Sequence, residues 1–256
     1  EVTPAELLDA ALARIAMLNP RFNAVIDTWV DEARRVIARG LPAGPFSGVP
    51  FLLKDNLPYK DTVLTYGSVC ARGLRSEGTH PLAERFDAAG LVTFGRTNMC
   101  EFGLVPHSIS ELHGATRNPW SASHCPGGSS GGAAAAVACG MVPMAHGNDG
   151  GGSIRIPASA CGVFGLKPSR GRTPEDPQQE PNAIIAQLCL SRSVRDSATL
   201  LDACQGTRPG ERFSAPPAPC AYRQAAARDP AKPLRIAFLT QNLAGETIHP
   251  DCVAAV

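Results

Sequence analysis

Two glycine-rich segments, each enclosing a serine, limit the structures that this chain can adopt more than any other part of its sequence does. "CPGGSSGG" covers residues 125–132 and "GNDGGGSIR" covers residues 147–155. Glycine runs cost conformational entropy on folding, so they indicate a backbone that adopts positive φ angles or lets another group come very close. A flexible linker is the simpler interpretation of one such segment. Two segments that both enclose a serine argue against it.

A phosphate-binding loop is the first functional alternative, because glycine loops before helices expose N–H groups to anions. The spacing G-x-x-x-x-G-K-[ST] is absent, and neither segment is followed by a suitably placed lysine. The sequence therefore does not favour nucleotide binding.

Composition limits the broad class of protein. The 256 residues are 44% hydrophobic and 18% charged, which is enough apolar material for the core of one large domain or two small ones. A net charge of +1 gives no global field that would attract nucleic acid or an anionic membrane. No apolar stretch reaches membrane-spanning length and no signal region opens the chain, so we expect a cytoplasmic protein.

Nine cysteines are scattered along the chain, odd in number and never spaced C-x-x-C. This pattern favours reduced, mostly buried thiols over disulfides. It also gives no reason to expect a zinc site, and we expect no metal.

Helix and strand patterns alternate through the middle of the chain. "GVPFLLK" (48–54) is typical of a buried strand, and "HPLAERFDAAG" (80–90) predicts a helix before the strand "LVTFGRTN" (91–98). "GGAAAAVACG" (131–140) predicts a closely packed helix of small residues, followed by the strand "MVPMAHG" (141–147). Such alternation implies crossover connections and indicates an α/β fold with a mainly parallel sheet.

The two ends of the chain carry weaker patterns. A capping box of Thr3 and Glu6, with Pro4 in the first turn, predicts a helix that stops at Asn19-Pro20. The other predicted segments are a strand at 22–26, a helix at 31–38, a proline-rich connection at 207–233, a strand at 234–240 and a helix at 249–256.

Four motifs together identify a family resemblance. "GVPFLLKDN", "GGSSGG", "DGGGSIRIP" and "CGVFGLKP" closely resemble the amidase signature family of serine amidohydrolases, and "TNMCEFG" and "RNPW" extend the match over nearly the whole chain. The resemblance implies a mixed, largely parallel twisted sheet covered by helices on both faces. Family members are considerably longer, so we expect residues 1–256 to be the N-terminal and central part of one domain, incomplete at its C-terminus, with the 207–233 connection inside it.

The resemblance also implies a Ser-Ser-Lys triad. Lys54 of "LLKDN" is the implied general base, Ser129 the proton relay and Ser153 the nucleophile that becomes acylated. The separation of 24 residues between the two serines agrees with the family pattern and selects Ser129 rather than Ser130. In the family the relay serine follows a cis peptide bond. The implied chemistry needs no metal or organic cofactor.

Physical chemistry supports these implied roles. Taken alone, Lys54 would be read as a solvated lysine at a strand end. Serine is a weak nucleophile that needs a base, and an uncharged lysine can serve if burial lowers its pKa by roughly three units from about 10.4. Consecutive N–H groups from Gly150, Gly151, Gly152 and Ser153 are suited to an oxyanion hole, where a side chain would obstruct the scissile carbonyl.

Three neighbours of these groups are supporting candidates. We interpret Ser130 as a hydrogen-bond donor at a helix start. Asp149 and Arg155 flank the nucleophile and favour an ion pair that holds the loop, with a substrate contact by Arg155 as the alternative. His146 is an isolated histidine at a strand end, which is more often a core or rim residue than a base.

Three functions remain open. The first is hydrolysis of a small-molecule amide; "GGGS" and "KPSRGR" resemble the branch of the family that contains 6-aminohexanoate cyclic-dimer hydrolase. The second is the glutamine-hydrolysing subunit of a tRNA-dependent amidotransferase, against which "LKPSRGRTP" argues. The third is a truncated, inactive family member. No nucleic acid or membrane partner is expected, and a homodimer is left open.

Overall fold

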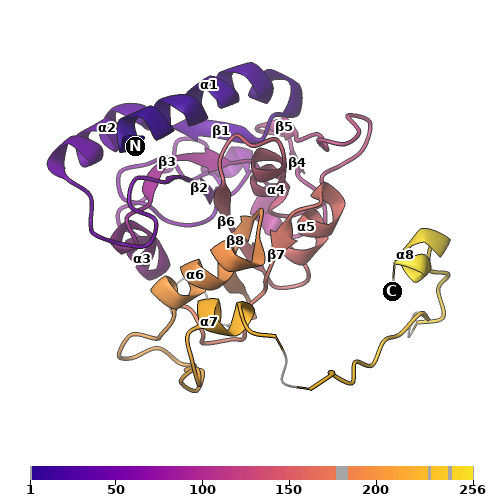
Figure 1. Cartoon of the computed structure of the whole chain (residues 1–256). Helices are drawn as coiled ribbons and strands as arrows, with labels where there is room; N and C mark the ends of the chain where they lie inside the picture. Colours follow the sequence, from indigo (N-terminus) through magenta and orange to yellow (C-terminus); the bar gives the residue numbers. More distant parts are fainter. Residues whose placement is uncertain (1, 177–183, 230–231, 242–243, 256) are drawn as a thin grey trace. The chain divides into compact units, whose positions relative to one another are not determined.

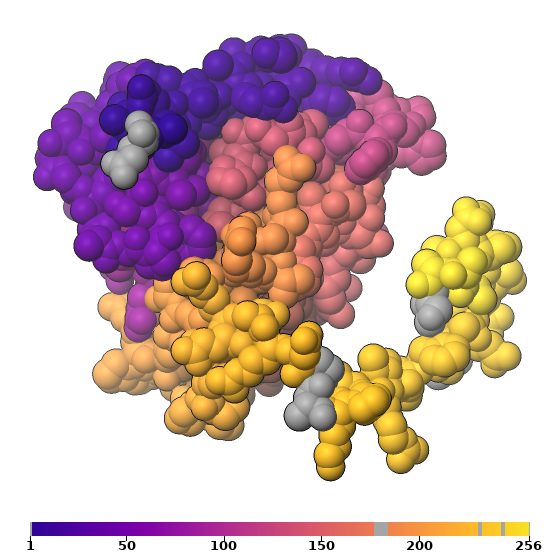
Figure 2. All heavy atoms as spheres, viewed as in Figure 1, coloured from indigo at the N-terminus to yellow at the C-terminus, as the bar shows by residue number. Residues whose placement is uncertain are grey.

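The structure is a computed structural model that describes residues 2–176, 184–229, 232–241 and 244–255. The chain divides into two compact units, Glu1–Ala226 and Ala227–Val256. The first unit contains the central sheet and every candidate site residue. In the space-filling view, the indigo residues of the first helix form a continuous ridge along one edge of this unit (Figure 2).

Six strands form the central sheet in the order β1-β3-β2-β6-β8-β7 (Figure 1). β3, β2 and β6 pair in parallel, whereas β1 is antiparallel to β3 and β8 is antiparallel to both β6 and β7. Four of the six strands in this sheet thus point the same way, which confirms a mixed, largely parallel sheet. The strands are β1 (Val25–Thr28), β2 (Pro50–Lys54), β3 (Val92–Thr97), β6 (Met144–Asp149), β7 (Phe164–Gly165) and β8 (Ala186–Ser191), and a separate pair is β4 (Ile109–Ser110) with β5 (Gly114–Ala115).

Helices cover both faces of the sheet, as expected. Successive side chains of a strand point to opposite faces. Accordingly, Leu52 of β2 joins the core cluster beneath α1, α4 and α5, while Phe51 and Leu53 join the cluster beneath α3 and α6. In Figure 1, α1 lies above the strands and α3 and α6 lie below them. The helices are α1 (Pro4–Phe22), α2 (Val30–Arg39), α3 (Pro81–Ala88), α4 (Gly131–Ala138), α5 (Arg155–Cys161), α6 (Val194–Cys204), α7 (Tyr222–Ala226) and α8 (Pro250–Ala254), with 3-10 turns at Val69–Ala71 and Glu101–Gly103.

The first helix begins as predicted and ends later. Thr3 and Glu6 form the reciprocal capping box. The predicted stop at Asn19-Pro20 is wrong, because Pro20 lies inside α1 and the helix ends when Asn23 adopts the left-handed conformation, with φ 49°. A proline removes only one intrahelical hydrogen bond. Asn19 Oδ1 then accepts the N–H groups just beyond the helix end, at 2.8 Å each.

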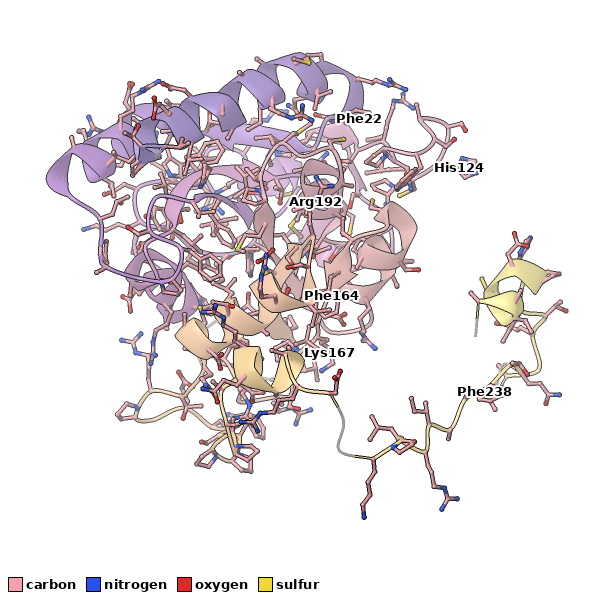
Figure 3. All side chains as sticks on the ribbon, viewed as in Figure 1. Phe22, His124, Phe164, Lys167, Arg192 and Phe238 are labelled. Atoms are coloured by element: carbon pink, nitrogen blue, oxygen red, sulfur yellow. The ribbon has the colours of Figure 1, made fainter. Side chains whose placement is uncertain are left out.

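Residues 234–240 do not form the predicted strand. Leu234, Ile236 and Phe238 are exposed, and Phe238 projects from an extended segment (Figure 3). A strand is stabilised by ladder hydrogen bonds to a neighbour, and no described strand pairs with this segment. The predicted C-terminal helix is present as α8, and its last predicted residue, 256, lies outside the described residues.

Part of the predicted proline-rich connection is helical. Residues 222–226 form α7, whose first N–H groups are accepted by the Asp202 carboxylate of α6 at 2.7 and 2.9 Å. Residues 230–231 of the predicted connection lie outside the described residues.

All nine cysteines are free thiols. Four of them are buried, three are intermediate and two are exposed, so burial is less general than predicted. The described residues contain no group of three metal-ligating side chains and no helix both long and apolar enough to cross a membrane.

Candidate active site

Three elements bring the predicted triad to one edge of the sheet. Lys54 is the last residue of β2, Ser129 lies just before α4, and Ser153 lies between β6 and α5. Because β2 and β6 are parallel neighbours, their carboxyl ends meet at the same edge, where α/β proteins commonly bind ligands. The Ser130 N–H donates to the Ser153 carbonyl at 3.2 Å and joins the two serine loops.

Lys54 is fully buried, and its Nζ lies 2.7 Å from Ser129 Oγ. Burial lowers the pKa of Lys54 to about 7, although Cys100 and Asp149 act in the opposite direction. A substantial fraction of this amine is therefore uncharged at neutral pH and able to accept a proton. The side chain is thus buried next to the relay candidate, unlike a solvated lysine at a strand end.

Close backbone packing explains the glycines around Ser129. A Cβ on Gly128 would lie 2.1 Å from the carbonyl oxygen of His107, and one on Gly132 would lie 2.4 Å from the backbone nitrogen of Asn98. Real side chains do not tolerate such distances. The peptide bond between Gly128 and Ser129 is cis, as the family resemblance implied.

Ser108 holds this loop and was not identified from the sequence. Its Oγ accepts the Gly131 N–H at 2.9 Å and donates toward the Gly127 carbonyl at 3.1 Å. A Cβ on Gly131 would lie 2.4 Å from the same hydroxyl. Ser108 belongs to none of the motifs in the sequence, so no pattern reveals this role.

The loop before Ser153 is wrapped around the buried carboxylate of Asp149. This carboxylate accepts the backbone N–H groups of Gly152, Ile154 and Arg155 at 2.7 to 3.2 Å. It also accepts the Nε and one terminal nitrogen of Arg155, both at 2.9 Å. Burial alone would raise the pKa of Asp149, but Arg155 and these N–H groups outweigh it and lower the pKa to about 2. The expected ion pair is present and holds the loop.

The oxyanion-hole prediction needs one correction. The Gly152 N–H donates to Asp149 Oδ1 at 2.7 Å, so it is used inside the loop. The N–H groups of Gly150, Gly151 and Ser153 have no hydrogen-bond partner among the described residues. These three remain the candidate donors.

The three glycines of this loop differ in what they require. Gly152 has φ +130°, and a Cβ there would lie 2.6 Å from Ile156 Cδ1. A Cβ on Gly151 would meet nothing within 4 Å, and one on Gly150 would make an ordinary contact with Ile185 at 3.5 Å. The conformation therefore demands glycine at position 152, whereas positions 150 and 151 have room for a Cβ.

A sequence profile for the family described as Amidase matches residues 6–256. The match covers nearly the whole chain and includes all three triad candidates. The chain belongs to the amidase signature family.

This amidase signature chain is 42% identical to the 6-aminohexanoate-cyclic-dimer hydrolase of Paenarthrobacter ureafaciens over an alignment 268 residues long. The alignment covers all of this chain and 53% of the relative. A solved structure of 6-aminohexanoate cyclic dimer hydrolase matches with TM-score 0.94 and 42% identity over 99% of this chain and 54% of its own. A solved glutamyl-tRNA(Gln) amidotransferase structure from Thermotoga maritima matches with TM-score 0.69 and 28% identity over 84% of this chain and 49% of its own. The chain thus spans about half the length of the relatives it matches.

Ser130 and Ser153 of this family member need a closer description. Ser130 occupies the position before α4, but its Oγ donates to the Asn148 carbonyl at 3.3 Å rather than capping the helix. Ser153 is partly buried, and its Oγ has no hydrogen-bond partner among the described residues. The Ser153 hydroxyl is therefore free to contact a substrate.

Two residues of β6 contact Lys54 and were not assigned to the site from the sequence. Asn148 Oδ1 accepts a hydrogen bond from Lys54 Nζ at 2.6 Å, and His146 Nδ1 accepts the Lys54 backbone N–H at 3.3 Å. His146 is fully buried, which agrees with its interpretation as a core residue rather than a base. In the sequence, His146 and Asn148 are alternate residues at the end of a predicted strand, which indicates that they share a face of the sheet. This spacing does not show that Lys54 is the residue they contact.

Proposed function

We propose that this chain carries the catalytic residues of an amidase that hydrolyses a carboxylic amide through an acyl-enzyme on Ser153. The observation that supports this most directly is the fully buried amine of Lys54, with a pKa of about 7, placed 2.7 Å from Ser129 Oγ. An amine that is partly uncharged at neutral pH and bonded to a hydroxyl is suited to general-base catalysis.

Proton transfer would run through Ser129. Lys54 Nζ takes the proton of Ser129 Oγ, Ser129 Oγ takes the proton of Ser153 Oγ, and Ser153 Oγ forms a bond to the amide carbon. The described structure has no hydrogen bond between the two serine hydroxyls. Catalytic hydrogen bonds are often long in an unliganded site and shorten when substrate binds, so this geometry is compatible with the relay.

Breakdown of the tetrahedral intermediate returns the protons. Lys54 gives its proton back to Ser129, Ser129 protonates the departing amine nitrogen, and the C–N bond breaks. Water then attacks the acyl group on Ser153 by the same relay and releases the acid. The N–H groups of Gly150, Gly151 and Ser153 would stabilise the oxyanion, and loss of one such donor typically raises the barrier by about 3 kcal/mol.

Exposed apolar side chains next to the triad favour substrates with apolar groups around the amide. Phe102, 52% exposed, precedes Gly103, and a Cβ on Gly103 would lie 3.2 Å from Ser129 Oγ. Ile156, 39% exposed, lies against Gly152, the residue before Ser153. The hydrolase relative named for a cyclic dimer of 6-aminohexanoate supports the same substrate class, so we extend the proposal to cyclic and linear aliphatic amides.

The alternatives to this proposal are a glutamine-hydrolysing subunit and an inactive family member. Release of amine or ammonia from three substrates, with Ser153→Ala as control, decides among the functions. The substrates are 6-aminohexanoate cyclic dimer, a linear aliphatic amide and glutamine. Turnover of an aliphatic amide that requires Ser153 supports the proposal. Turnover of glutamine alone supports the amidotransferase alternative, and no turnover supports the inactive chain.

A further inference from the structure

Two polar side chains of β6 hold Lys54 at its two ends. Asn148 Oδ1 lies 2.6 Å from Nζ, and His146 Nδ1 lies 3.3 Å from the backbone nitrogen. His146 and Asn148 occupy alternate positions of the strand, and both are buried. The strand beside β2 therefore contacts the candidate base through side chains as well as through the sheet.

Where the backbone pairing of β2 with β6 ends, the His146 side chain accepts the next β2 hydrogen bond. Phe51 pairs with Met144 and Leu52 with Ala145, and the described pairing stops there. Beyond that point the Lys54 N–H is accepted by the His146 ring. Because Nδ1 is the acceptor, the ring hydrogen is on Nε2, which faces the side-chain oxygen of Gln187 at 3.1 Å.

A neutral ring agrees with the surroundings of His146. Burial, and then the nearby Lys54, hold the pKa of His146 well below its ordinary value. The imidazole is thus a fixed acceptor for the Lys54 backbone rather than a competing base.

Asn148 occupies one hydrogen-bonding position of the Lys54 amine without exchanging a proton with it. A carboxamide oxygen accepts hydrogen bonds and takes up no proton near neutral pH, so one N–H of Nζ is directed at Asn148 whether Lys54 is charged or not. Among the described residues, Nζ has two hydrogen-bond partners, Asn148 Oδ1 and Ser129 Oγ. Of these two partners, only the Ser129 hydroxyl can exchange a proton with the amine.

We propose that Asn148 is a positioning residue for Lys54, which directs the amine so that its proton exchange goes to Ser129, while His146 fixes the Lys54 backbone. This inference rests on the proposed function, in which Nζ takes the Ser129 proton as the O–H bond breaks and the N–H bond forms. An uncharged oxygen at this position also leaves the amine without an ion-pair partner that would hold it protonated.

Other charged or titratable groups surround Lys54 from each neighbouring element. They are Asp55 after β2, Arg96 on β3, Cys100 in the following turn, and His146 and Asp149 on β6. None of them is a hydrogen-bond partner of Nζ in the described residues. A change at Asn148 therefore acts on the amine more directly than a change at any of these groups.

The test is the rate at which a fluorophosphonate labels the full chain, measured from pH 5 to 10. Asn148→Asp places a carboxylate beside Nζ, which favours the ammonium form, so the pH at half-maximal rate should rise by at least about 1 unit. Asn148→Leu removes an acceptor of the ammonium, so the midpoint should fall and the plateau rate should decrease about tenfold. Gln224→Glu, on exposed α7, adds the same charge at the surface and should leave the midpoint unchanged.

The outcomes separate this inference from the proposed function. A wild-type chain that is not labelled at any pH contradicts the proposed function itself. A labelled wild type whose midpoint stays within 0.3 units in both Asn148 variants overturns the positioning role. If Asn148→Asp does not fold, the downward shift in Asn148→Leu decides, because a merely structural role would reduce the folded fraction without moving the midpoint.

Discussion

The Lys54 amine and the Ser129 hydroxyl lie 2.7 Å apart although 75 residues separate them in the chain. Lys54 ends a strand whose side chains are buried on both faces of the sheet, and Ser129 lies in a loop that packs against backbone on two sides. This contact places a desolvated amine beside a hydroxyl, which is the arrangement that a lysine base requires. The burial that lowers the pKa of Lys54 therefore also affects the stability of the fold.

The first prediction concerns the energetic cost of burying Lys54. Its pKa falls from 10.5 in the unfolded chain to about 7 in the folded one, so between these values the unfolded state binds more protons and wild-type stability rises with pH. Lys54→Met lacks this pH-dependent contribution to the free energy of unfolding. Its free energy of unfolding relative to wild type should be most favourable at pH 6 and decrease by on the order of 4 kcal/mol by pH 10.

Urea unfolding of both proteins across this pH range measures the difference, and other titrating groups cancel in it. A stability difference that stays constant from pH 6 to 10 would show that Lys54 is not a buried, depressed-pKa amine.

The second prediction concerns the carboxylate that holds the nucleophile loop. The pKa of Asp149 is lowered from 3.8 to about 2, so its stabilisation is present above pH 3.8 and is lost as pH falls through 2. Asp149→Asn should lose about 2 kcal/mol of unfolding free energy at pH 7. The rate of probe labelling should fall as well, because the Gly152, Ile154 and Arg155 N–H groups on either side of Ser153 lose their charged acceptor.

Asp27→Asn is the matched control, because Asp27 is exposed and, within the described part of the chain, its carboxylate accepts one hydrogen bond, from the neighbouring Thr28 N–H. Its unfolding free energy should change by less than about 0.5 kcal/mol. Equal losses in the two variants would mean that the Asp149 contacts do not stabilise the loop.

The third prediction compares two glycines of the two serine loops. Gly128→Ala would place a Cβ 2.1 Å from a His107 backbone atom and should destabilise the fold by roughly 3 kcal/mol or more. Gly151→Ala enters open space and keeps its N–H, so its stability should stay within about 0.5 kcal/mol of wild type. Chemical denaturation measures both, and a Gly128→Ala variant as stable as Gly151→Ala would contradict the close packing around Gly128.

Local patterns predicted the parallel strands at the centre of the sheet and several of the helices beside them well. The Thr3 capping box, the apolar run of β2 and the small-residue helix α4 each carry their structural signal within a few residues. The predictions that failed depended on interactions beyond the local sequence. Pro20 removed one hydrogen bond without ending α1, and residues 234–240 have strand composition without a described neighbour to pair with.

The supporting contacts of the site were harder to predict because their partners are distant in sequence. Ser108 contacts Gly127, 19 residues later, and Asn148 contacts an amine 94 residues away. The Gly152 N–H was assigned to the oxyanion hole because glycine runs expose such groups, but the buried Asp149 carboxylate competes for it. Sequence spacing gives the number of available donors, and only the fold shows which of them are already used.

The most direct test of the central claim is the intact mass of this chain after treatment with a fluorophosphonate, beside Ser153→Ala and Lys54→Ala. We predict one adduct on the wild type, its complete loss in Ser153→Ala, and a labelling rate in Lys54→Ala that is lower by at least about 10³-fold. An adduct that persists in Ser153→Ala, or a wild type that stays unmodified, would contradict the assignment of Ser153 as a nucleophile activated through Ser129 and Lys54.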